Sequence, residues 1–81
     1  MTTFDQFEAT LAAQYQVLFE TPEYAYAKSR RTPEELAHKM TSGLAAGTAN
    51  KDGDGIRTAC KLLGIPHTYK AIRGALAGGL G

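Results

Sequence analysis

The chain has 81 residues, 43% of them hydrophobic, with a formal net charge of +1 and a single cysteine. A chain this short forms one small domain with a modest core, which leaves little room for a deep catalytic cavity, so we expect a binding protein with no cofactor rather than an enzyme. No apolar run approaches the roughly 20 residues of a membrane span, no signal peptide opens the sequence and no disulfide can form, which together indicate a cytoplasmic protein.

The first predicted helix runs from about Phe4 to Phe19. Apolar side chains recur along it at three- and four-residue steps, which predicts one buried face. It should end at Thr21-Pro22, because proline disfavours helical geometry in the residue before it. The same two residues also resemble a helix start, so we expect a short helical segment from Tyr24 to Arg31.

A stronger start signal follows at Thr32-Pro33-Glu34-Glu35. Threonine suits the N-cap, proline the first helical position, and Glu35 the reciprocal position of a capping box. Leu36, Met40 and Leu44 lie at four-residue spacing after it. The pattern therefore predicts a second long amphipathic helix.

Residues 48–55 read as a connector rich in turn residues. We expect Asp52 or Asp54 to cap the next helix, Ile56 to Leu63, and Gly64 to end it.

Tyr69, Ile72 and Leu76 predict a final amphipathic helix, and no segment shows the two-residue period of a strand. The expected fold is all-α, a compact bundle of four to five short helices in one domain over residues 1–77, with a flexible tail at 78–81. The expected core consists of the apolar residues at helical spacing: Phe4, Phe7, Leu11, Tyr15, Leu18, Leu36, Met40, Leu44, Ile56, Cys60, Leu63, Ile65, Tyr69, Ile72 and Leu76.

Charge is distributed unevenly along the chain. Residues 1–27 contain four acids and no base, whereas residues 28–81 contain nine bases against four acids, and no acid follows Asp54. Such asymmetry points to an anionic partner for the C-terminal half. Charge alone leaves a second interpretation open, in which the acidic first helix pairs with later basic ones.

The segment Ile56–Leu76 is the clearest functional signal, since it resembles a helix–turn–helix. Ala59 or Cys60 supplies the small residue needed inside the first helix, and Gly64 supplies the turn. The second helix departs from the usual spacing, because its first apolar residue is Tyr69, one position early.

In a DNA-binding interpretation, the start of the second helix would reach bases while the first helix meets phosphates. The expected base-contacting residues are His67, Thr68, Lys70 and Arg73, and the expected phosphate-contacting residues are Arg57 and Lys61. The plainer alternative is a pair of short amphipathic helices with no nucleic acid bound.

A second cluster, residues 24–31, interleaves tyrosines with Lys28, Arg30 and Arg31. Aromatic stacking beside basic side chains is a common way to hold single-stranded nucleic acid. Packing of the tyrosines with solvated bases is the favoured interpretation, because a small core needs aromatic residues.

Metal and nucleophile signals are weak. His38, Cys60 and His67 do not have the spacing of a zinc site, and Cys60 fits a small buried residue better than a nucleophile paired with His67. Residues 50–55 resemble the start of a calcium loop, but the twelfth position, which needs a carboxylate, is Lys61. We expect a turn there and no metal.

Two stretches, YAYAKSRRTPE at residues 24–34 and KDGDGIRTACKLLGIPHTYKAI at residues 51–72, resemble small uncharacterised proteins of tailed bacteriophages and prophages. The resemblance implies a bacterial host cytoplasm and two classes of function. One is a DNA-binding regulator, which we expect to act as a homodimer. The other is an inhibitor that blocks a host protein complex, such as RNA polymerase or an anti-phage (CRISPR) nuclease complex.

Overall fold

The computed structural model describes residues 4–22, 31–53 and 55–78. This part of the chain contains four α-helices and no strand, namely α1 (Phe4–Phe19), α3 (Pro33–Ala46), α4 (Ile56–Leu63) and α5 (Tyr69–Gly78), so the all-helical prediction is confirmed. The expected helical segment from Tyr24 to Arg31 lies, apart from Arg31, outside the described residues. None of the helices in the described ranges combines the length and the apolar character needed to cross a bilayer.

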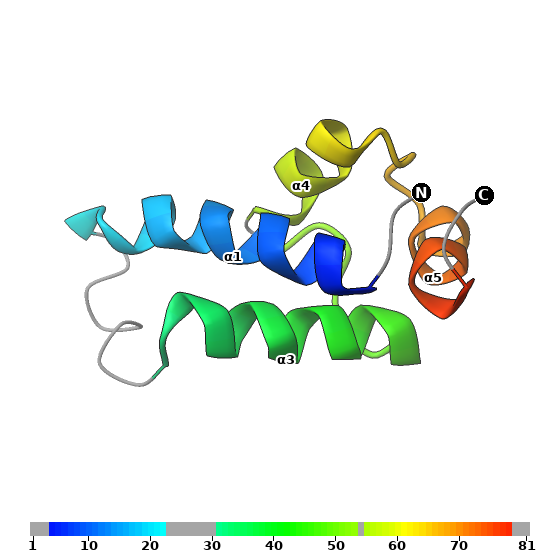
Figure 1. The fold of residues 1–81 in the computed structure, drawn as a ribbon, viewed down its shortest axis with the longest axis horizontal. Helices are drawn as coiled ribbons and strands as arrows, with labels where there is room; N and C mark the ends of the chain where they lie inside the picture. Colours follow the sequence, from blue (N-terminus) through cyan, green and yellow to red (C-terminus); the bar gives the residue numbers. More distant parts are fainter. Residues whose placement is uncertain (1–3, 23–30, 54, 79–81) are drawn as a thin grey trace.

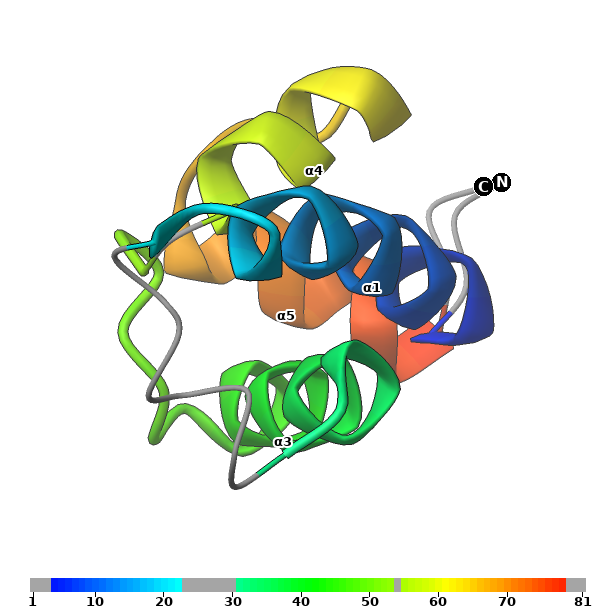
Figure 2. The same ribbon diagram turned by 90° about the vertical axis from the view of Figure 1, so that its left-hand side faces the viewer.

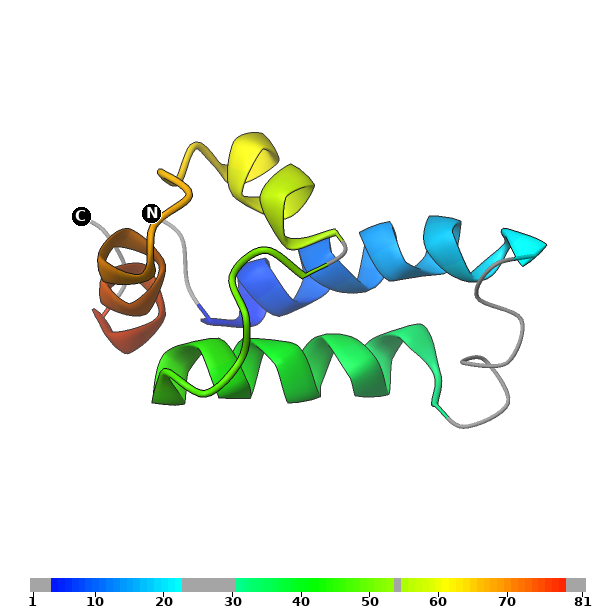
Figure 3. The same cartoon turned by 180° about the vertical axis from the view of Figure 1, so that it is seen from behind.

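Helices α1 and α3 form an antiparallel pair, with α4 on the side of α1 that faces away from α3 (Figures 1 and 3). Helix α5 crosses one end of the α1–α3 pair, as seen along α1 in Figure 2. The radius of gyration is 12.0 Å, close to the value of about 12 Å expected for a compact domain of this length.

The core lies between these helices and consists of side chains at helical spacing. Helix α1 buries every fourth residue on one face, as its sequence pattern predicts. The buried apolar residues are Phe7, Leu11, Tyr15, Phe19, Ala37, Leu44, Ile56, Ala59, Cys60, Ile65, Ile72, Ala75 and Leu76. Several expected core residues (Phe4, Leu18, Leu36, Met40 and Leu63) pack against this core and are partly buried.

Tyr69 was expected in the core, and this prediction is wrong, because the side chain is 40% exposed. Its phenol hydroxyl bonds to the backbone of the connector after α3, so the ring lies along the surface. Ile72, Ala75 and Leu76 form the buried face of α5 instead.

The start of α3 follows the predicted signal. Thr32 is the N-cap, and its hydroxyl accepts a hydrogen bond from the Glu35 N–H at 3.1 Å and donates to the Glu35 carboxylate at 3.2 Å. Gly47 ends the helix with a φ of 79°, a left-handed conformation that glycine adopts without a steric penalty.

The start of α4 differs from the prediction. Its N-cap is Gly55, with a φ of 82° and no side-chain cap, so Asp52 does not cap this helix, while Asp54 lies outside the described residues. A Cβ on Gly55 would lie 3.2 Å from the Gln14 Cβ. This close approach to α1 explains why the chain enters α4 on a glycine. Gly64 ends α4 with a φ of 72°, as predicted.

The end of α5 lies one residue beyond the expected domain boundary. The helix continues through Gly78, which was assigned to the tail, and residues 79–81 lie outside the described residues.

Candidate nucleic-acid interface

The outward faces of α4 and α5 carry bases and no acid. Each helix buries one face against the core, α4 against α1 and α5 mainly against α3. In α4 the opposite face exposes Arg57 and Lys61, which lie one helical turn apart and therefore project on the same side. In α5 the exposed face carries Lys70 and Arg73. Neither helix contains Asp or Glu.

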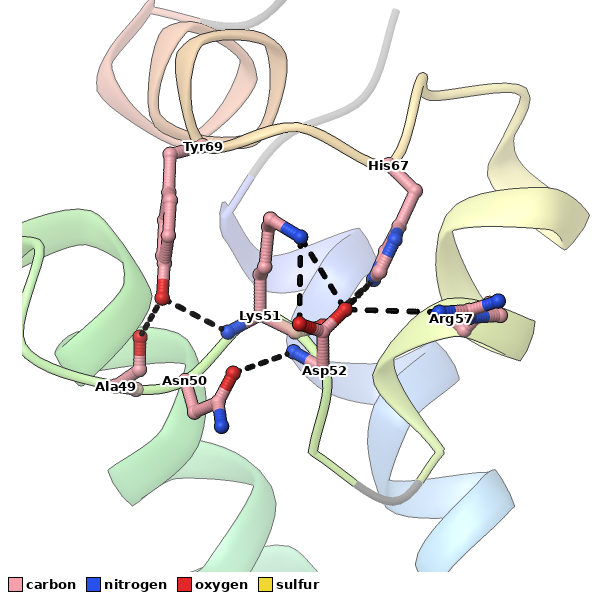
Figure 4. Close-up of polar contacts among 7 residues, drawn as sticks. All are labelled: Ala49, Asn50, Lys51, Asp52, Arg57, His67 and Tyr69. Atoms are coloured by element: carbon pink, nitrogen blue, oxygen red, sulfur yellow. Dashed lines mark hydrogen bonds and ion pairs between the residues drawn. The ribbon is translucent and has the colours of Figure 1, made fainter.

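Two segments that are distant in sequence, residues 49–52 and residues 67–69, are joined by hydrogen bonds (Figure 4). The His67 Nε2 lies 2.7 Å from the Lys51 carbonyl oxygen, to which it donates. The Tyr69 hydroxyl donates to the Ala49 carbonyl at 3.2 Å and accepts from the Lys51 N–H at 3.2 Å. We call Ala49, Lys51, His67 and Tyr69 the connector clamp, since they hold the start of α5 to the chain that leaves α3.

Asp52 lies at the centre of the charged groups beside the connector clamp (Figure 4). Its Oδ1 lies 3.2 Å from the Lys51 Nζ and 3.6 Å from both the Arg57 Nη2 and the His67 Nε2. The hydrogen bond from Lys51 is the main cause that lowers the Asp52 pKa below its ordinary value of 3.8, and the nearby cations lower it further. Asp52 therefore offsets part of the positive charge of this region.

Two of the four expected base-contacting residues belong to the turn before α5. The His67 side chain is only 22% exposed, since its imidazole is bound to the connector. The Thr68 hydroxyl accepts from the Ala71 N–H at 3.2 Å, so it caps the first turn of α5.

The other two expected base-contacting residues lie within α5 and differ from each other. The Arg73 guanidinium lies against the end of α3, where a Cβ on Gly47 would be 3.4 Å from the Arg73 Cζ. A cation near a helix C-terminus interacts favourably with its exposed carbonyl groups. Lys70 is exposed, and no hydrogen bond or ion pair to another described residue involves its ammonium group.

Of the second predicted cluster, only Arg31 lies within the described residues. Lys28 and Arg30 lie outside the described residues. Arg31 is exposed and lies where α3 begins, at the end of the α1–α3 pair that is remote from α5 (Figure 1). There it borders a small cavity of about 240 Å³, whose other lining residues are Gln16, Phe19, Glu20, Thr32 and Pro33.

The cysteine and the histidines have structural surroundings. Cys60 is 1% exposed, and burial raises the pKa of its thiol, as expected of a small buried residue. His38 Nδ1 lies 2.8 Å from the Glu8 Oε1 and links α3 to α1. Within the described ranges, no three His, Cys, Asp or Glu side chains lie together in a way that could hold a metal ion.

Sequence reasoning missed the connector clamp. Tyr69 and Lys51 are 18 residues apart, and His67 and Lys51 are 16 apart. No local pattern relates positions at such separations. The one available signal for these contacts was the presence of His67 and Tyr69 just after Pro66. A histidine ring and a tyrosine hydroxyl need polar partners when they are partly buried.

Comparison with protein-family models, with curated proteins and with solved structures finds no match to this chain. The resemblance of residues 24–34 and 51–72 to tailed-phage proteins stays a prediction.

Proposed function

We propose that the chain is a small duplex DNA-binding protein that uses α4 and α5 as a helix–turn–helix-like pair. The observation that carries this proposal is the charge of the two outward faces. Arg57, Lys61, Lys70 and Arg73 are all exposed, and neither helix contains an acid. Duplex DNA carries one negative charge per about 1.7 Å of helix axis, and neutralising its phosphates releases condensed counterions.

Lys61 and Lys70 are the strongest phosphate-binding candidates. Both are exposed, and no hydrogen bond or ion pair within the described ranges involves either ammonium group. The Arg57 side chain is 75% exposed and lies 3.6 Å from Asp52, an exposed pairing that contributes little and can exchange for a phosphate. These three cations would give a salt dependence with a log–log slope of about −2.7.

The proposal is tested by fluorescence anisotropy with a labelled mixed-sequence duplex over a range of salt concentrations. Replacing both lysines (Lys61→Ala/Lys70→Ala) should weaken binding and reduce the slope by about 1.8, because two phosphate contacts are lost. Lys39→Ala is the matched control. Lys39 is exposed on α3, on the far side of α1 from α4 (Figure 1).

Two results would contradict the proposal. One is the absence of measurable binding to duplex DNA at low salt. The other concerns the control. If Lys39→Ala reduces the log–log slope by as much as each lysine replaced in Lys61→Ala/Lys70→Ala, then net charge and not the α4–α5 surface accounts for binding.

A second candidate function is supported by the exposed leucine on α4. The Leu62 side chain is 63% exposed and follows Lys61 on the outward face. An apolar side chain among bases suits the acidic, partly apolar surface of a protein, as in a phage inhibitor of a host polymerase or nuclease complex. The test is a pull-down from nuclease-treated bacterial lysate. Capture of a bacterial protein in stoichiometric amount by the parent, and its loss with Leu62→Ser, would support this alternative over DNA.

A further inference from the structure

We infer that the chain binds the phosphate backbone of duplex DNA without reading the base sequence. This inference rests on the proposed function and specifies the class of its ligand. Base recognition by a helix–turn–helix needs side chains at the start of the second helix that are free to enter the major groove. At the start of α5, the side chains of His67, Thr68 and Tyr69 hold the fold together, and Lys70 is the free one.

His67 and Tyr69 are committed to the connector clamp. The His67 Nε2–H points to the Lys51 carbonyl at 2.7 Å, and the side chain is 22% exposed. The Tyr69 hydroxyl uses both its donor and its acceptor capacity on the backbone of residues 49–51. Turning either ring toward a base would leave these backbone groups without their partners, at the cost of unsatisfied polar groups.

Thr68 and Arg73 are also occupied. The Thr68 hydroxyl caps α5 through the Ala71 N–H, and the Arg73 guanidinium lies over Gly47 at the end of α3. Both residues are exposed, so these contacts bias the two side chains toward the fold and away from a base edge.

Of the groups that distinguish base pairs, the remaining exposed residues of α4 and α5 offer only those of arginine, lysine and threonine. Adenine is read by Asn or Gln, and cytosine by Asp or Glu, and α4 and α5 contain none of these four. Besides Tyr69, the polar side chains left exposed on the two helices are Arg57, Thr58, Lys61, Lys70 and Arg73, and arginine or lysine reads guanine only when it is held in a fixed geometry at the base edge. Lysine contributes a flexible point charge, which favours contact with phosphates over a fixed geometry at one base.

The test is selection from a pool of random-sequence duplexes of about two helical turns, roughly 20 bp, with the intact protein at low salt. We expect the selected pool to show no common motif and to bind with an affinity within about threefold of that of the starting pool. Sequence-specific proteins bind their sites about 10³-fold or more tighter than non-specific DNA. A motif that recurs in independent selections would overturn the inference and leave the proposed function standing. An undetectable affinity for the starting pool would overturn both.

Two variants sharpen the selection. His67→Gln removes the imidazole and should lower the unfolding temperature without creating or changing a sequence preference, while a changed preference would show that residue 67 contacts bases. Lys70→Ala should weaken binding to an A·T-rich and a G·C-rich duplex by the same factor. A loss confined to one of the two duplexes would show that Lys70 reads a base and would overturn the inference.

Discussion

Among the described residues Thr41 is the one buried polar residue, and its replacement by valine should stabilise the protein. The residue is 0% exposed, on the buried face of α3, and its hydroxyl has no hydrogen-bond partner among the described residues. Valine has nearly the same shape as threonine and a methyl group in place of the hydroxyl. The substitution Thr41→Val therefore removes an unsatisfied polar group without opening a cavity.

The size of the effect follows from this burial. A buried hydroxyl without a partner costs about 1–3 kcal/mol of desolvation free energy, and the helix propensities of threonine and valine are similar. We expect the free energy of unfolding to rise by about 1–2 kcal/mol. For a domain of this length, 1 kcal/mol corresponds to roughly 4–8 °C in the unfolding temperature.

Thermal and urea unfolding followed by circular dichroism would measure this change. Thr58→Val is the matched control, because Thr58 is exposed on α4 and its replacement should alter stability by less than about 0.5 kcal/mol. Thr41→Ser keeps the hydroxyl and loses a buried methyl group, so it should destabilise by about 1 kcal/mol. A fall in stability for Thr41→Val would refute the reasoning, since it would show that the hydroxyl is hydrogen-bonded in solution.

Three further predictions concern stability and reactivity. Gly64→Ala should lower the free energy of unfolding, measured in urea, by about 1 kcal/mol, because φ is +72° although the space around the Cβ position is open. Gly74→Ala, in open space within α5, should raise it by about 0.5–1 kcal/mol. Changes of the same sign for the two substitutions would contradict this account. Because the folded-state pKa of Asp52 is lowered from 3.8, its stabilisation is present above that value and is lost progressively as pH falls below it and through the lowered pKa. The parent should therefore be more stable than Asp52→Asn near neutral pH, and this difference should shrink as the pH is lowered below 3.8. A difference that stays constant in acid would argue against this explanation. Cys60, whose pKa is raised by burial, should react with iodoacetamide far more slowly in the folded protein than in urea, and similar rates would show that the thiol is accessible.

The sequence pattern predicts most of the local structure correctly. The bounds of α1 and α4, the Thr32 cap of α3 and the role of Gly64 all match the structure. These features depend on residues within four or five positions of one another, through helical periodicity, side-chain caps and the left-handed conformation of glycine. They are local, so they can be read along the chain.

Features that depend on contacts between helices were predicted less well. Tyr69 has the spacing of a core residue but lies at the surface, because the backbone of residues 49–51 offers its hydroxyl two partners. Asp52 suits an N-cap, yet Gly55 takes that place where the chain passes close to Gln14. In both cases a tertiary contact outweighs a local preference.

The same division holds for the candidate interface. The sequence by itself determined that four bases and no acid occupy the last two helices, because composition and periodicity are properties of the chain. The contacts between helices set which of these side chains interact with the fold: His67 and Thr68 form hydrogen bonds and Arg73 lies beside Gly47, whereas Lys61 and Lys70 are exposed without a hydrogen bond or ion pair within the described ranges. Hydrogen bonds and packing between distant segments set which side chains are free, and these contacts exist only once α5 lies across the end of α1 and α3.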